Sequence, residues 1–210
     1  MSKRSGNFVT LADVVREVGK DVVRFTMLTR KADAQMDFDF AKVVEASKDN
    51  PVFYVQYAHA RIESLKRKVA AEFLPEQSSG RGTVADGGGV TTSLPLHHSP
   101  NGPPPQAGLR EDLDLLDAED LALIKLAAQF PRIVESAAAS YEPHRIAFYL
   151  YDLAAAFHAY YNLGNDRPER RILVVNDPIL TTSRLFLAAA IGQIIANGLS
   201  IMGVEPAREM

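Results

Sequence analysis

Cysteine is absent from the 210 residues of this chain. The chain therefore cannot form a disulfide, and a metal site built on cysteine thiolates is excluded. Absence of cysteine is compatible with a reducing compartment, and we expect the protein to be cytoplasmic.

Long apolar runs and a large charge of one sign are missing as well. No apolar run reaches the roughly 18 residues of a membrane span, and the polar N-terminus lacks the apolar segment of a secretory signal. The net charge is −3, with +3 on residues 1–75 and −5 on residues 109–210. This is not the strongly basic balance of a protein that binds nucleic acid by charge alone. Neither a membrane nor DNA is an expected partner.

Helical periodicity is what the sequence has in abundance. Apolar residues recur at helical spacing, and candidate cap residues, among them Thr10, Asp21, Asn50 and Asp117, stand at segment starts. The pattern predicts helices over 10–19, 21–30, 40–73 (two helices or one bent helix), 118–130 with a break at Pro131, 142–162 and 183–203, with an extended connector at 34–40 and a polar loop at 163–181.

No strand pattern accompanies these helices. We therefore expect an all-α fold, a bundle of roughly five or six helices. The segment 183–203 is apolar nearly all round and should lie in the middle of the bundle.

One segment, residues 75–108, differs in composition from the rest. It is dense in Gly, Pro and Ser and has no periodicity, so it cannot bury enough apolar surface to order itself. We expect a flexible surface insertion. Its adjacent His97 and His98 have no further metal-binding residues nearby, so we expect them to be solvated, and we expect no metal site.

Two groups of residues could bind a ligand. The stretch SKRSGN (2–7) combines cations, Ser and Gly, which suits phosphate contact, although a frayed basic terminus gives the same pattern. Aromatic residues beside Arg61 and Arg145 could stack unpaired bases, or could pack in the core with a polar end reaching water; half or more should be structural. They are Tyr54, Tyr57, His59, Tyr149, Tyr151, His158, Tyr160 and Tyr161. No nucleophile–base pair is apparent, so the residues alone indicate a binding module.

Four stretches resemble arginyl-tRNA synthetases. MSKRSGN is similar to the KMSKS signature of class I aminoacyl-tRNA synthetases from its second letter, and its spacing to VTLADVV is typical of the arginine family. NPVFYVQYAHARI, PHRIAFYLYDLAAAFHAYYN and SRLFLAAAIGQIIANGLSIMGVEPAREM resemble the start, middle and end of that family's anticodon-binding domain.

The resemblance implies a division of the chain. Residues 1–45 would form the signature loop and a helical connector that contacts the tRNA stem. Residues 46–210 would form an anticodon-binding helical bundle of the DALR type, with the insertion 75–108. Met1 would be an internal methionine, preceded by the family's nucleotide-binding domain.

The resemblance also implies residue roles. Lys3 matches the signature lysine that neutralises ATP phosphates during adenylate formation, so it would be catalytic, and Ser2, Lys3 and Arg4 would bind ATP, used with magnesium by the complete enzyme. Arg4 stands where the signature has serine, and the signature's first lysine is absent. The resemblance implies that Met210 and either Tyr160 or Tyr161 bind tRNA. From the aromatic group described above, we expect Tyr57, His59 and Arg61 to bind tRNA as well.

The function implied is the tRNA-binding part of an arginine–tRNA ligase, which supports ATP-dependent arginylation in translation. Its partners would be arginine tRNA and the catalytic domain of the same polypeptide, without which this chain would be inactive. The alternative is a free-standing helical RNA-binding or protein-interaction module, for which MSKR is the true start.

Overall fold

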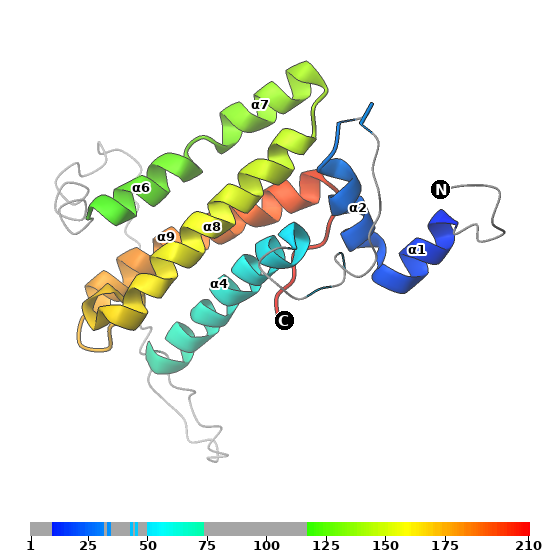
Figure 1. Ribbon diagram of the computed structural model, residues 1–210. Coiled ribbons are helices and arrows are strands. Elements are labelled where there is room, and N and C mark those ends of the chain that lie inside the picture. Colours follow the sequence, from blue (N-terminus) through cyan, green and yellow to red (C-terminus); the bar gives the residue numbers. More distant parts are fainter. Residues whose placement is uncertain (1–9, 32, 35–42, 44, 46–49, 74–116) are drawn as a thin grey trace, which may run out of the picture.

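The computed structural model describes residues 10–31, 33–34, 43, 45, 50–73 and 117–210. Every regular element in these ranges is a helix, which confirms the predicted all-α bundle (Figure 1). Three groups of predictions lie outside the described residues: Ser2, Lys3 and Arg4 of the signature loop, most of the connector 34–40, and the insertion 75–108 with His97 and His98.

Two short helices form the described part of the connector. α1 (Leu11–Val18) begins at the predicted cap Thr10, which forms a capping box with Asp13. Gly19 has φ +87°, and this turn leads directly into α2 (Lys20–Leu28). The prediction that Asp21 caps α2 is wrong, because Gly19 occupies the cap position without a side-chain bond and Asp21 lies in the first turn.

α4 (Pro51–Phe73) is one continuous helix. The Asn50 side chain accepts hydrogen bonds from the amides of Val52 (3.2 Å) and Phe53 (3.5 Å), which confirms Asn50 as its cap. The same side chain donates to the carbonyls of Val43 (2.8 Å) and Glu45 (2.9 Å). The cap therefore also ties the preceding chain to the helix.

The second half of the chain folds into longer helices. α6 (Ala118–Ala127) has the predicted Asp117 cap, and α7 (Phe130–Ser140) carries Pro131 in its first turn. The break therefore comes just before Pro131, since a proline is compatible with the start of a helix. α8 (His144–Asp166) follows after a turn at Tyr141.

Both predicted boundaries of the loop 163–181 are wrong, because the loop is shorter than predicted. α8 continues to Asp166, a short 3-10 helix η1 spans Pro168–Arg170, and α9 begins already at Pro178 and ends at Ile201. Asp177 caps α9 by accepting from the Leu180 amide at 3.0 Å. Gly203 follows the end of α9 with φ +68°.

α8 and α9 form the centre of the bundle. In Figure 1, α6 and α7 lie along one side of α8 and α4 lies along the other, while α1 projects away from the bundle. α8 carries five apolar residues at helical spacing on one face, and each of them is at most 4% exposed. These residues are Ile146, Leu150, Leu153, Ala154 and Phe157.

α9 packs closely against α4 and α8 because two glycines face them. A Cβ at Gly192 would lie 2.9 Å from Ile62 Cγ2, and one at Gly198 would lie 2.6 Å from Leu150 Cδ2. By length and composition α9 is apolar enough to cross a membrane, which corrects the expectation that no segment qualifies. α9 is this apolar because it packs against α4, α6 and α8, and a helix in the middle of a bundle is apolar on most sides.

Candidate nucleic-acid interface

Arg61 of α4 lies between two tyrosine rings. Its guanidinium carbon is 4.6 Å from the centre of the Tyr57 ring and 4.4 Å from that of Tyr161 on α8. Its Nη2 also donates to the Tyr57 hydroxyl at 2.8 Å. A guanidinium over an aromatic face is attracted by the ring's electrons, so the two rings hold Arg61 in one orientation.

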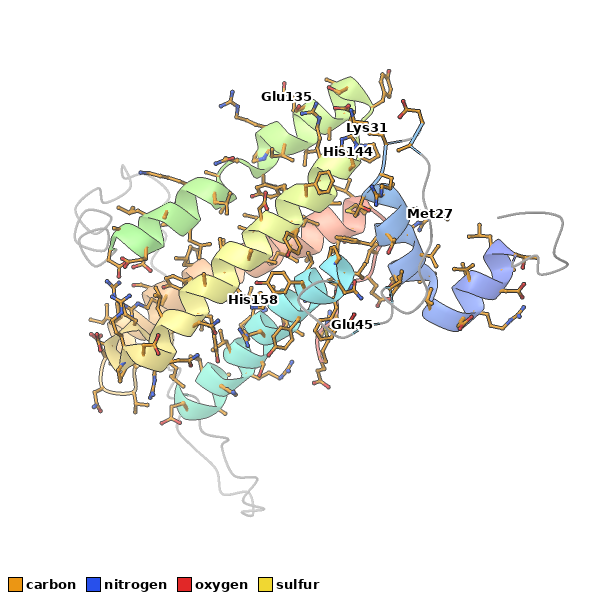
Figure 2. All side chains as sticks on the ribbon, in the orientation of Figure 1. Met27, Lys31, Glu45, Glu135, His144 and His158 are labelled. Carbon is orange, nitrogen blue, oxygen red and sulfur yellow. The ribbon has the colours of Figure 1, made fainter. Side chains whose placement is uncertain are left out.

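His158 of α8 fixes the other end of this guanidinium. Its Nδ1 accepts from Arg61 Nη1 at 3.1 Å, and its Nε2–H donates to the Tyr54 carbonyl at 3.3 Å. Figure 2 shows His158 where α8 and α4 lie side by side. Burial, helped by the Arg61 charge and opposed by the Tyr54 hydrogen bond, holds the pKa of His158 below its ordinary value. His158 is therefore a neutral acceptor at neutral pH.

We call this surface the α4–α8 face and define it by five half-buried side chains: Phe53, Tyr54, Tyr57, Arg61 and Tyr161. Phe53 and Tyr57 are stacked, with ring centres 5.9 Å apart and planes 10° from parallel. These five side chains are planar groups that remain partly exposed to solvent. Unpaired nucleobases stack on such groups.

Residues 203–210, the tail, return along α4 on a different flank from α8. Gln56 bonds the tail at Glu205 and Ala207, and His59 Nδ1 donates to the Ala207 carbonyl at 2.7 Å. His59, predicted to contact tRNA, is thus buried against the tail instead of lying on the α4–α8 face. Met210 at the end of the tail is 60% exposed and accessible to a ligand.

Tyr160 has a different environment from Tyr161. It is 7% exposed, and its hydroxyl donates to Asp120 Oδ1 on α6 at 2.6 Å. Burial and the neighbouring Asp120 carboxylate raise its pKa above the usual tyrosine range. The sequence left open which of the two tyrosines stacks on a base, and the structure leaves only Tyr161 with an accessible ring.

Other aromatic residues singled out in the sequence stabilise the bundle. The Tyr149 hydroxyl donates to the carbonyls of Leu126 (3.1 Å) and Ala127 (3.2 Å), and burial raises its pKa to about 12. Four of the eight aromatic candidates are buried: His59, Tyr149, His158 and Tyr160. Among the described residues, no group of three or more His, Asp or Glu side chains is arranged to hold a metal ion.

The sequence analysis missed Gln56 and Asp120. Gln56 lies between apolar neighbours and carries no pattern that distinguishes it. Asp120 lies in the first turn of α6, where it completes the capping box with Asp117 and is fully buried. A carboxylate three residues after a cap residue is the signal that could have found it.

Comparisons with known proteins show which family this chain belongs to. The family model of the DALR anticodon binding domain matches residues 104–210. The arginine–tRNA ligase of Novosphingobium aromaticivorans is 61% identical over all of this chain, and that of Rhodospirillum rubrum is 51% identical. The structure of Thermus thermophilus arginyl-tRNA synthetase matches 99% of the chain with a TM-score of 0.64 and 25% identity.

The match covers only part of each relative. This chain spans about a third of the length of the curated relatives, 31% and 32%, and 29% of the Thermus protein. The family model begins after α4, yet α4 packs on α8 and α9 and contributes to the same core. The chain belongs to the DALR anticodon-binding domain family, in the form found in the C-terminal part of arginine–tRNA ligases.

Proposed function

We propose that this chain binds the anticodon region of arginine tRNA through the α4–α8 face, as part of an arginine–tRNA ligase acting in translation. The observation that carries the proposal is Arg61, held between Tyr57 and Tyr161 on an accessible surface of an anticodon-binding domain. The names of relatives that are up to 61% identical support arginine as the amino acid.

The chemistry of the face suits unpaired bases of an anticodon loop. Stacking on an aromatic ring contributes about 1–3 kcal/mol per base. Arg61 and its two tyrosine rings are already in contact, so binding orders few side chains. The exposed thioether of Met210 is a further apolar surface for a base.

The proposal extends to the complete enzyme. The rest of the polypeptide would supply the catalytic domain, and Lys3, with Ser2 and Arg4, would contact the phosphates of ATP, used with magnesium in the cytoplasm. Lys3→Ala in the complete enzyme should slow adenylate formation far more than it weakens arginine binding. No finding favours the alternative of a free-standing module.

A binding titration tests the anticodon assignment. We expect arginine tRNA to bind this chain more tightly than the same tRNA with a substituted anticodon. Tyr161→Ala should lower the affinity for the natural anticodon several-fold, because it removes one ring that orients Arg61. Phe186→Ala is the matched control, since Phe186 is an exposed aromatic residue of α9. Equal affinity for the two tRNAs would contradict the proposal.

A further inference from the structure

We propose that Gln56 is a positioning residue that holds the tail, residues 203–210, against α4 and thereby sets where Met210 meets a bound tRNA. The inference rests on the proposed function for its tRNA part. Gln56 itself is 8% exposed and lies beneath the tail, so it would act without touching the nucleic acid. Figure 1 shows the tail passing alongside α4 after the end of α9.

The side-chain amide of Gln56 bonds two groups of the tail backbone, the carbonyl of Glu205 and the amide of Ala207. Its Nε2 donates to the Glu205 carbonyl at 2.8 Å, and its Oε1 accepts from the Ala207 amide at 2.7 Å. Backbone groups in a segment outside helices and sheets still need partners. Gln56 thus supplies the donor and acceptor that a neighbouring strand would supply. A carboxylate of the same length lacks the donor.

Other contacts with the tail are more exposed or longer. Arg24 donates to the Gly203 carbonyl at 3.2 Å, the Glu205 amide donates to Asp21 at 3.4 Å, and Arg67 donates to the Arg208 carbonyl at 3.4 and 3.5 Å. Among the described side chains, His59 gives the other short bond, again at Ala207. Gly203 and Val204 are held instead by backbone bonds to the carbonyls of Ser200 and Leu199 at the end of α9, both at 2.9 Å. Beyond Val204 the tail is therefore held most firmly at Glu205 and Ala207, both bonded by Gln56.

Gln56 is next to Tyr57 in α4, so the tail is bonded close to the α4–α8 face. Adjacent helix residues point about 100° apart, so the side of α4 that bonds the tail through Gln56 is next to the side that carries Tyr57. A tail fixed at Gln56 restricts the positions open to Met210, three residues after Ala207. A loosened tail would spread Met210 over many positions, and a base contact would then have to order it.

The test compares Gln56→Ala with Gln193→Ala. Gln193 is an exposed glutamine of α9 whose side-chain amide donates to Asn197 at 2.8 Å. Hydrogen exchange of the Ala207 amide, measured without tRNA, should become several-fold to tenfold faster in Gln56→Ala, as expected for loss of one hydrogen bond. Gln193→Ala should leave it unchanged. Gln56→Glu keeps the size and the acceptor, and should also speed exchange because its carboxylate repels the Glu205 carbonyl.

The second part measures affinity for arginine tRNA. Gln56→Ala should weaken binding about as much as removal of Met210, and the two changes together should weaken it no further, because both act through Met210. Unchanged Ala207 exchange in both Gln56 variants would overturn the anchoring role. Faster exchange with wild-type affinity, or with additive losses, would overturn the positioning role. A wild-type chain that ignores the anticodon would instead refute the proposed function, while the exchange measurement would still decide the anchoring role.

Discussion

Tyr160 and Tyr161 are neighbours on α8, yet they belong to two different regions of the molecule. Tyr160 faces α6, is 7% exposed and donates its hydroxyl to Asp120. Tyr161 faces α4, is half-buried and carries the Arg61 guanidinium 4.4 Å from its ring centre. Consecutive helix residues point about 100° apart, so a single step in sequence separates the side of α8 that stabilises the bundle from the side that is open to a ligand.

The α6 side is stabilised by polar groups that bond one another. Arg184 is 5% exposed and donates to the carbonyls of Glu169 (2.7 Å) and Arg171 (2.8 Å), while Arg170 pairs with Asp117. Together with Asp120 and Tyr160 they connect α6, α8, η1 and α9. Removing one member leaves buried partners unsatisfied, so changes there should affect stability, whereas changes on the α4 side should affect binding.

The largest effect should come from Asp120→Ala. It removes the acceptor of the buried Tyr160 hydroxyl and half of the α6 capping box, and should lower the free energy of unfolding by about 2–4 kcal/mol. Thermal or urea unfolding measures it. Asp13→Ala is the control, because Asp13 holds the equivalent capping-box position on exposed α1 and should cost well under half as much. Equal losses would show that the Tyr160 contact contributes nothing.

The second prediction is that Tyr160 matters for stability and Tyr161 for tRNA binding. Tyr160→Phe should lower the free energy of unfolding by about 1–3 kcal/mol, because Asp120 loses its partner inside the bundle, and should leave anticodon discrimination unchanged. Tyr161→Ala should lower tRNA affinity several-fold, which Tyr160→Phe should not, because of the two rings only that of Tyr161 contacts Arg61. Unfolding and binding measured on both variants decide it. A binding defect confined to Tyr160→Phe would reverse the assignment of the two sides of α8.

The third prediction separates stacking from charge on the α4 side. Arg61→Lys keeps the positive charge but loses the planar group that lies between Tyr57 and Tyr161. Affinity for arginine tRNA should fall several-fold, while its dependence on salt concentration should stay the same, since the number of neutralised phosphates is unchanged. Arg132→Lys, at an exposed site on α7, is the control. A changed salt dependence would mean that Arg61 binds a phosphate.

Local signals in the sequence predicted most of the fold. The caps at Thr10, Asn50 and Asp117 and the core stripe of α8 were found because each depends on residues within a few positions. The start of α9 was missed although Asp177–Pro178 repeats the cap-then-proline signal of Asn50–Pro51. Four polar residues, 181–184, separate that cap from the continuous apolar pattern, so periodicity alone places the start of the helix too late.

The site was predictable only in part. Tyr57 and Arg61 share a side of α4 because they are four residues apart, and the sequence shows that. It does not show that Tyr161 completes the pair or that Tyr160 bonds Asp120, because these contacts depend on how helices pack. Gln56 was missed for the same reason, since its partners in the tail follow about 150 residues later.

The smallest expected effect concerns pH at His158. Its folded-state pKa lies below the ordinary value of about 6.5 that applies to the unfolded chain. As pH falls below 6.5, the unfolded chain therefore binds the proton first, and the free energy of unfolding should decrease until the folded pKa is passed. Each unit of pKa lowering is worth about 1.4 kcal/mol. The groups that face His158 are Tyr54, Tyr57 and Arg61.

Protonation of His158 should also weaken tRNA binding in the same pH range. The imidazolium can no longer accept from Arg61 Nη1, and two cations would then face each other across 3.1 Å. His158→Gln removes the titrating group but keeps a side chain that can accept from Arg61. We therefore expect unfolding and tRNA affinity to depend less on pH below 6.5 in His158→Gln than in the wild type. Identical pH profiles for the two proteins would show that Arg61 is held by the tyrosine rings alone.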